Sequence, residues 1–248
     1  MARNDFRSPR LYVDAPLVPG AELPLDKART NYLVNVLRLK PNDAVLVFNT
    51  RDGEWRARLA GTGKRATLTV DGQTRPQTVP GDLHYLFAPL KHARLDYMVQ
   101  KAVELGASRL QPVMTRHAQV ARVNLDRMRA NAIEAAEQCG ILTLPDIAAP
   151  VTLERMTAEW ESARLLIFCD EDAEVRDPVA ALAAVHRGER TPLAVLIGPE
   201  GGFAADERAA LLELPHVVRL ALGPRILRAD TAAVAALALV QAVLGDWR

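Results

Sequence analysis

The chain has 248 residues, of which 49% are hydrophobic and 25% charged, and its net charge is +1. This composition is ordinary for a globular protein with one large domain or two smaller ones, and it excludes disorder as the main state. No basic segment followed by an apolar core opens the chain, and the longest apolar stretch, 232–244, contains Gln241 and is shorter than the roughly 20 residues of a membrane span. We therefore expect a cytoplasmic protein without a membrane segment.

Basic residues concentrate at the N-terminus. Residues 1–75 hold 13 lysines and arginines against 8 acidic residues, whereas residues 76–248 hold 18 against 22. A basic N-terminal part is typical of a module that binds phosphates, although a solvated basic surface has the same balance.

The first 75 residues are predicted to form mostly strands. Turn signals at 41–43 and 51–53 separate short strand-forming runs, a spacing typical of a small β-barrel. The predicted strands are Ala44–Phe48, Glu54–Leu59 and Ala66–Val70, and one helix is predicted over Lys27–Leu37. The proline- and glycine-containing segment 73–82 marks a domain boundary, so we expect one domain over 1–75 and a second over 76–248.

From Leu83 onward strands alternate with helices. Apolar runs predict strands, and apolar residues at helical spacing predict helices that end at Gly106 and Gly140, the second of them capped by Asn124. The predicted strands are 83–88, 110–114, 165–169, 193–197 and 217–222, and the last helix is 231–244. This alternation predicts an α/β domain with a largely parallel sheet.

The sequence offers no metal site. The two cysteines, Cys139 and Cys169, are too few for a disulfide framework and lack a zinc spacing, so we interpret both as small buried residues. The five histidines are dispersed without a metal-binding motif, and we expect no metal.

Two glycine-bearing turns, each after an apolar run, are the most informative motifs: LIGPEGGF over Leu196–Phe203 and LGPRILRADTA over Leu222–Ala232. Glycine lets the backbone approach a ligand, and ligands of parallel sheets bind beyond the carboxyl ends of strands, so the turns predict a backbone-lined pocket. The first turn has neither a dinucleotide-binding nor a P-loop motif. Taken singly, each is a structural turn, with Glu200 capping the next helix and Asp230 or Thr231 capping the last one.

The two turns together resemble the cofactor signatures of the RsmE-type rRNA methyltransferases, the uridine-N3 branch of the SPOUT class. Segments FRSPRLYV, NYLVNVLRLKPNDAVLVFN, QKAVELGASRLQPV and EAAEQCG resemble the same family in the same order. The resemblance implies an α/β SPOUT methyltransferase domain with a C-terminal trefoil knot, preceded by a PUA-like β-barrel. It also implies S-adenosylmethionine as cofactor and a homodimer in which the second subunit completes the site.

Carried over residue by residue, the resemblance implies a cofactor pocket formed by Leu196, Ile197, Gly198, Pro199, Glu200, Gly201, Gly202, Leu220, Leu222, Gly223, Ile226, Leu227 and Arg228. The glycines permit the backbone to approach the cofactor closely, and the aliphatic residues supply walls for the adenine. Taken alone, each aliphatic residue could instead belong to the hydrophobic core. The implied reaction methylates ring nitrogen 3 of a uridine in 16S rRNA of the small ribosomal subunit. We hypothesise that Arg228 stabilises negative charge on the uracil oxygens and that a partly buried Glu200 takes part in binding or proton removal.

RNA binding is expected from the barrel, where Arg7, Arg10 and Arg38 match basic positions of the family pattern and could contact phosphates. Three positions depart from that pattern: Asn31 replaces a usual histidine, Ile141 a usual arginine, and Asp230 a usual glutamate. Two alternatives stay open, namely a SPOUT enzyme acting on another RNA and a non-catalytic protein for RNA binding or ribosome assembly.

Overall fold

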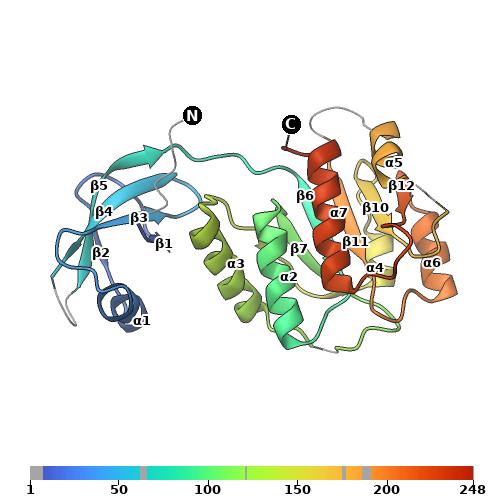
Figure 1. Ribbon diagram of the computed structural model, residues 1–248, viewed down its shortest axis with the longest axis horizontal. Helices are drawn as coiled ribbons and strands as arrows, with labels where there is room; N and C mark the ends of the chain where they lie inside the picture. Colours follow the sequence, from blue (N-terminus) through green and yellow to red (C-terminus); the bar gives the residue numbers. More distant parts are fainter. Residues whose placement is uncertain (1–7, 62–65, 121, 175–176, 186–190, 248) are drawn as a thin grey trace. The chain divides into compact units, whose positions relative to one another are not determined.

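The computed structural model describes residues 8–61, 66–120, 122–174, 177–185 and 191–247 (Figure 1). The chain divides into two compact units. Unit 1 comprises Met1–Val79 with Ala136–Leu144, and unit 2 comprises Pro80–Ala135 with Pro145–Arg248. Among the described residues, every helix is too short or too polar to span a membrane.

Unit 1 is built on a five-stranded sheet. Its strands are β1 (Arg10–Tyr12), β2 (Glu22–Pro24), β3 (Ala44–Phe48), β4 (Glu54–Ala60) and β5 (Thr67–Arg75). They lie in the order β1-β3-β4-β5-β2, with β1 parallel to β3 and the other pairs antiparallel. Two register shifts between β4 and β5 bend the sheet, because a bulge increases local twist, and the sheet curls around a core that includes Val45, Val47 and Leu68.

The predicted strands of unit 1 are confirmed, but the predicted helix is wrong in type. Helix α1 (Lys27–Thr30) begins at Asp26, whose Oδ1 accepts a 2.8 Å hydrogen bond from the Arg29 amide, and it passes into a π-helical turn, η1 (Asn31–Val36). Two residues after this turn, Arg38 has a φ of 57°, in the left-handed region. Strands β1 and β2, with three residues each, are too short to give a periodic signal in the sequence.

The turn between β3 and β4 requires glycine. Gly53 has a φ of +79°, and a Cβ placed there would lie 2.3 Å from the Arg75 carbonyl oxygen. Any side chain at this position would therefore push β4 away from the end of β5.

Unit 2 is built on a parallel sheet. Its strands are β6 (Leu83–Phe87), β7 (Arg109–Met114), β8 (Asp146–Ile147), β9 (Val151–Thr152), β10 (Leu165–Cys169), β11 (Leu193–Ile197) and β12 (Val217–Leu220). The order is β12-β10-β11-β6-β7-β8, β9 also pairs with β7, and every pair is parallel. All five residues of β11 are buried, as expected for a strand covered on both faces.

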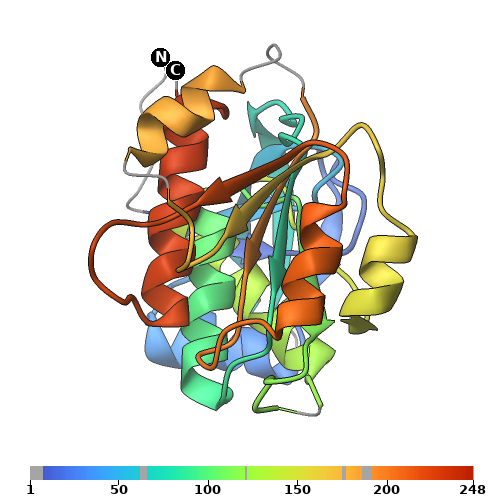
Figure 2. The same cartoon turned by 90° about the vertical axis from the view of Figure 1, so that its right-hand side faces the viewer.

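Helices cover both faces of this sheet. The helices that follow β6 along the chain are α2 (His92–Glu104), α3 (Leu125–Cys139), α4 (Leu153–Ala158), α5 (Pro178–Ala184), α6 (Ala205–Leu212) and α7 (Ala229–Val243), and α3 ends within unit 1. Helix α7 packs against α2, α5 and β11, while α4 packs against α6. Figure 2 shows α2, α5 and α7 on one face and α4 and α6 on the other.

The predicted α/β alternation and parallel sheet are confirmed, with shifts at several element ends. Asn124 caps α3 as predicted, because its Oδ1 accepts a 3.0 Å hydrogen bond from the Arg127 amide. Strand β12 ends at Leu220 instead of residue 222, and α7 begins at Ala229. Asp230 therefore lies in the first turn of α7 and does not cap it, and Arg228 occupies the N-cap position without a side-chain hydrogen bond. The short elements β8, β9, α4, α5 and α6 were not predicted.

Candidate active site

A cavity of about 320 Å³ opens at the carboxyl ends of three adjacent strands, β10, β11 and β12. Strand β10 lies between the other two, and the chain leaves it first toward β11 and later returns to β12 on its other side. Such a change of direction leaves a crevice between the loops that follow the strands, and this is where ligands of parallel sheets bind. Both glycine-bearing turns line the cavity, as the sequence predicted.

The first turn packs tightly against an aromatic side chain at the edge of the cavity. A Cβ on Gly198 would lie 2.4 Å from Cε2 of Phe203, whose ring meets Phe168 of β10 edge-on with 5.1 Å between centroids. Because Gly198 has no Cβ, its backbone can lie directly against the Phe203 ring. The contact with Phe168 holds the Phe203 ring, and with it the first turn, in place.

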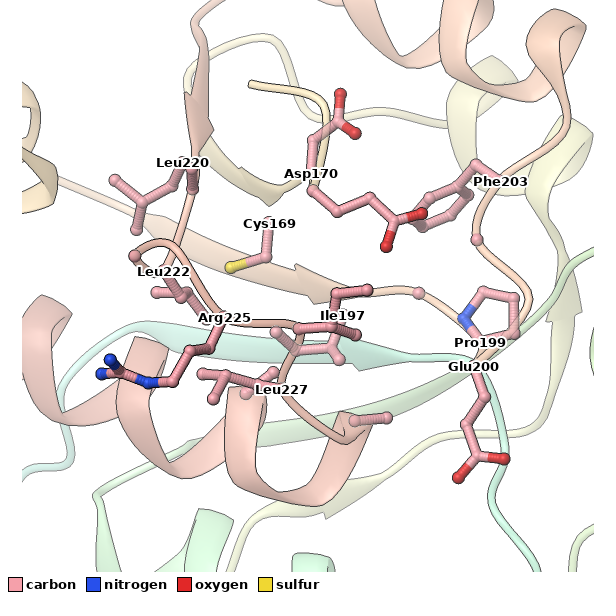
Figure 3. A pocket seen from close by; sticks show the side chains of 18 of the residues that line it. Cys169, Asp170, Ile197, Pro199, Glu200, Phe203, Leu220, Leu222, Arg225 and Leu227 are labelled. Carbon is pink, nitrogen blue, oxygen red and sulfur yellow. The ribbon is translucent and has the colours of Figure 1, made fainter. Parts of the chain in front are cut away.

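The middle of the cavity is apolar (Figure 3). Ile197, Leu220, Leu222 and Leu227 line it together with the Cys169 thiol. Burial, and secondarily the Asp170 carboxylate, raises the pKa of Cys169 to about 12. The thiol is therefore neutral at physiological pH and contributes an apolar surface, without the thiolate that a nucleophile requires.

One end of the cavity is acidic. Asp170, 3% exposed, follows β10; it accepts a hydrogen bond from Arg219 Nη2 at 2.7 Å and forms an ion pair with Arg208 Nη2 at 3.1 Å. Glu171 also lines the cavity and lies over Gly202, where a Cβ would come within 3.1 Å of its Oε1. This end suits a cation or hydroxyl groups, because carboxylates accept hydrogen bonds and attract positive charge.

The structure brings together ten of the residues predicted to bind the cofactor. They are Ile197, Gly198, Pro199, Glu200, Gly202, Leu220, Leu222, Gly223, Ile226 and Leu227. The other three do not line the cavity: Leu196 is buried in the core of unit 2, Gly201 is exposed beside His117, and Arg228 is exposed at the start of α7.

Three further lining residues, Ala221, Pro224 and Arg225, lie within the segment Leu220–Arg228 that the resemblance assigns to the pocket. Seven lining residues were missed: Cys169, Asp170, Glu171, Phe203, Arg208, Ala229 and Ala232. The charged pair that directly follows the apolar run 165–169 was an available signal for this end of the site. This pair lies beside the glycine-bearing turns because β10 is the neighbour of β11 and β12, and this strand order cannot be read from the sequence.

Glu200 lies at the cavity without capping a helix. Its side chain is 37% exposed, and it is thus partly buried as predicted. It does not cap the next helix, because Glu207 Oε2 accepts the Ala204 amide at 2.9 Å there. Instead, Oε1 of Glu200 binds Arg94 of α2 and Oε2 accepts a 3.2 Å hydrogen bond from Gln119 Nε2. Since both oxygens have donors, the contacts favour a binding role over proton removal.

The three arginines predicted to bind RNA have different settings. Arg7 lies outside the described residues. Arg10 is 6% exposed and its Nε donates a 2.9 Å hydrogen bond to Glu54, so it stabilises unit 1 and is not available to a phosphate. Arg38 is exposed and remains a prediction.

The cysteine prediction is corrected in part, since Cys139 is exposed whereas Cys169 is largely covered. Within the described ranges, no group of three or more histidine, cysteine, aspartate or glutamate side chains is arranged to hold a metal ion.

Family models match both parts of the chain. The RNA methyltransferase domain matches residues 77–241, and the RNA methyltransferase PUA domain matches residues 25–71. Ribosomal RNA small subunit methyltransferase E of Rickettsia conorii is 29% identical over 234 residues, which cover 94% of each chain. The protein of the same name from Synechocystis is 29% identical over 95% of this chain and 78% of its own.

Solved structures agree with these matches. Ribosomal RNA small subunit methyltransferase E of Neisseria gonorrhoeae, bound to S-adenosylmethionine, has a TM-score of 0.85 and 26% identity, and the match covers 98% of this chain and 100% of that one. A Legionella pneumophila structure with bound S-adenosylmethionine has a TM-score of 0.82 and 28% identity, covering 97% of this chain and 99% of that one. The resemblance found in the sequence is confirmed, and the chain belongs to the RNA methyltransferase family, with its methyltransferase domain preceded by a PUA domain.

Proposed function

We propose that this protein is an S-adenosylmethionine-dependent methyltransferase that modifies ring nitrogen 3 of a uridine in 16S rRNA of the small ribosomal subunit. The observation that carries the proposal is the cavity that the two glycine-bearing turns form beyond β10, β11 and β12. Two proteins that share the fold over nearly their whole length hold S-adenosylmethionine.

The residues of the cavity fit this cofactor. Aliphatic side chains, among them Ile197 and Leu222, form walls of the kind that enclose an adenine, and Gly198 leaves the backbone of the first turn accessible. Asp170 and Glu171 would accept hydrogen bonds from ribose hydroxyls or from the cationic amino group. The volume of about 320 Å³ lies within the range of small-molecule sites.

When bound, the cofactor supplies a sulfonium methyl group that passes to uracil N3, while the carbon–sulfur bond breaks to leave a neutral thioether and the N3 proton is lost. The protein has mainly to align the base and stabilise the charge that spreads to the uracil oxygens. Arg228, exposed beside the cavity at the start of α7, would stabilise this charge.

Unit 1 would bind the RNA outside the target nucleotide. The PUA family match and the basic balance of residues 1–75 support this role, and we assign RNA binding to that part of the chain. Arg38, exposed shortly after η1, is the predicted phosphate contact that the structure leaves accessible.

We further propose that the protein works as a homodimer in the cytoplasm, and that the segments 198–203 and 221–228 belong to the crossing of a trefoil knot. The support for a dimer is Ile226, which lines the cavity yet is 91% exposed in the single chain. A large apolar residue at the mouth of a site is stabilised when a second subunit covers it.

The function is tested by incubating the full chain with isotope-labelled S-adenosylmethionine and either naked 16S rRNA or small ribosomal subunits, followed by mass mapping of the digested nucleosides. We expect labelled 3-methyluridine in 16S rRNA. A different methylated nucleoside would indicate another RNA target, and RNA binding without any methylation would indicate a non-catalytic protein.

A further inference from the structure

A groove of about 720 Å³ lies on the sheet of unit 1. It is lined by residues of β3, β4 and β5 and by Asn42, in the turn before β3. Strand β4 is the central strand of this sheet (Figure 1). The groove shares no residue with the cofactor cavity, so holding the methyl donor does not account for it.

Two arginines of β4 point into this groove. Arg56 and Arg58 line it and are exposed. They alternate with Ala57 and Leu59, which are buried in the core of unit 1, because successive side chains of a strand point to opposite faces of the sheet. Two cations about 7 Å apart along one strand suit a linear polyanion better than a compact anion.

The sheet leaves room beside these arginines. Arg58 lies opposite Ala44 of β3. Arg56 lies between Leu46 of β3, which is buried, and Gly72 of β5. A Cβ on Gly72 would have no atom within 4 Å, so the space above this residue is open. An extended ligand backbone can therefore approach the guanidinium groups closely.

The charged side chains of the groove leave hydrogen-bond donors for an anion. Two arginines face one carboxylate, that of Asp71. Asp71 Oδ2 accepts a 2.7 Å hydrogen bond from Arg58 Nε, and the two terminal nitrogens of Arg58 have no acceptor among the described residues. The Arg56 guanidinium likewise has no acceptor within the described part of the chain. Asp71 thus orients Arg58 while leaving its outer donors to a ligand, and arginine binds phosphates through pairs of such donors.

We propose that this groove binds the sugar–phosphate backbone of the RNA substrate, with one phosphate on Arg56 and the next on Arg58. The proposal rests on the proposed function, which makes the ligand an RNA, and it adds a binding surface apart from the residues of the cofactor cavity. Contacts of this kind position the RNA without reading its sequence.

RNA fits the groove better than an acidic protein segment does. The RNA methyltransferase PUA domain matches residues 25–71, which include both arginines and Asp71. Asn42, at the edge of the groove, follows shortly after the exposed Arg38, the other arginine that we assign to a phosphate. The regularly spaced phosphates of an RNA strand suit cations in a row, and residues 1–75 have an excess of basic over acidic residues.

The proposal is tested by filter binding of naked 16S rRNA and of small ribosomal subunits to the full chain at several salt concentrations. In the double variant Arg56→Ala, Arg58→Ala, the slope of log affinity against log salt should become less steep by about 0.7–0.9 for each arginine, and the affinity for naked rRNA should fall about tenfold. The KM for RNA rises accordingly. The affinity for S-adenosylmethionine stays within about twofold, because neither arginine lines the cofactor cavity.

A matched pair of variants at Gly72 tests the groove without removing an arginine. Gly72→Asp places a carboxylate in the open space beside Arg56 and should weaken RNA binding, whereas Gly72→Ala adds only a methyl group and should bind RNA like the natural chain. Arg51→Ala is the control for loss of an exposed arginine of unit 1, because Arg51 pairs with Asp14 and does not line the groove. All variants should keep the melting temperature of the natural chain within a few degrees.

An unchanged slope in the double variant, or an equal change in Arg51→Ala, would overturn the proposal. Weaker binding of small ribosomal subunits with unchanged binding of naked rRNA would also overturn it, because the partner of the groove would then be a ribosomal protein. If the natural chain binds rRNA through the groove but methylates none, the groove is supported and the proposed function fails. Methylation with an unchanged slope in the double variant would have the reverse meaning.

Discussion

Asp170 at the end of β10 accepts two hydrogen bonds from Arg219 of β12, at 2.7 Å from Nη2 and 3.1 Å from Nε. The Asp170 side chain is 1% exposed and lines the cofactor cavity, whereas the Arg219 side chain is 34% exposed and reaches solvent. The pair therefore ties together two neighbouring strands whose following segments form the site, and it holds a carboxylate at the acidic end of the cavity.

Replacing this carboxylate tests its structural role. Asp170→Asn should lower the free energy of unfolding by about 1–3 kcal/mol, because two arginines lose a charged acceptor but can still be solvated. Denaturant unfolding measures the change. Asp172→Asn, which removes a more exposed partner of Arg208, is the control and should cost less. Equal losses in the two variants would show that burial of Asp170 adds nothing.

Gly198→Ala should abolish cofactor binding while leaving the protein folded. The added Cβ would lie 2.4 Å from the Phe203 ring, so either the ring leaves Phe168 or the first turn lifts into the cavity. Calorimetry with S-adenosylmethionine measures the loss. Gly81→Ala is the matched control, because a Cβ at Gly81 has no atom within 4 Å. Unchanged affinity in Gly198→Ala would mean that the turn does not contact the cofactor.

The sequence was sufficient for the α/β alternation because buried parallel strands are apolar along their whole length. The strands 165–169 and 193–197 were predicted with their observed bounds for this reason. Short or edge elements such as β8 carry too few residues for a period, and the π-helical turn has the same apolar spacing as an α-helix over so short a length.

The site was predictable only in part. The glycine-bearing turns are local signals, and most of their residues line the cavity. Asp170 and Glu171 belong to the site because β10 lies between β11 and β12, an order that long-range pairing decides. The partner of Glu200 is Arg94, 106 positions away, and no local pattern indicates that contact.

Arg228→Ala should reduce turnover far more than cofactor affinity. Arg228 does not line the cofactor cavity, but it lies exposed at the N-cap of α7, beside the segment that does. Loss of a group that stabilises developing negative charge costs about 10²–10³ in kcat. Single-turnover methylation and cofactor calorimetry on the same preparation measure both quantities. Equal losses in turnover and affinity would contradict the proposed role of Arg228.

His84 of β6 should make unit 2 sensitive to mild acid. Burial, and secondarily the neighbouring Arg164, lowers the pKa of His84 to about 4, from an ordinary value of 6.5. Between pH 6.5 and 4, His84 therefore binds a proton in the unfolded chain but not in the folded chain. The free energy of unfolding does not depend on His84 above pH 6.5, and it decreases as the pH drops from 6.5 toward 4.

Thermal unfolding between about pH 7.5 and 4 measures this effect, and His84→Gln, which cannot titrate, should flatten the curve in that window. Burial raises the pKa of the neighbouring Asp82, but the hydrogen bonds and the charge of Arg164, with a smaller effect of His84, together outweigh it and hold this pKa below its ordinary value of 3.8. The stability that depends on Asp82 is therefore lost at lower pH. Parallel curves for the natural chain and His84→Gln would contradict the assignment.

Arg38→Ala should weaken RNA binding and reduce its salt dependence. Each phosphate that the protein no longer neutralises lowers the slope of log affinity against log salt by about 0.7–0.9. Arg38 is exposed, so the melting temperature should stay the same, whereas Arg10→Ala should lower it because Arg10 is buried against Glu54. Filter binding of 16S rRNA at several salt concentrations measures the slopes. An unchanged slope in Arg38→Ala would show that Arg38 does not contact an RNA phosphate.

The central claim is that the two glycine-bearing turns enclose the methyl donor, and titration of the folded full chain with S-adenosylmethionine in a calorimeter tests it most directly. We predict saturable binding in the natural chain, and chemical-shift changes of the bound protein confined to the ends of β10, β11 and β12 and the segments that follow them. A folded natural chain that gives no binding heat, or whose shift changes lie elsewhere, would contradict the account.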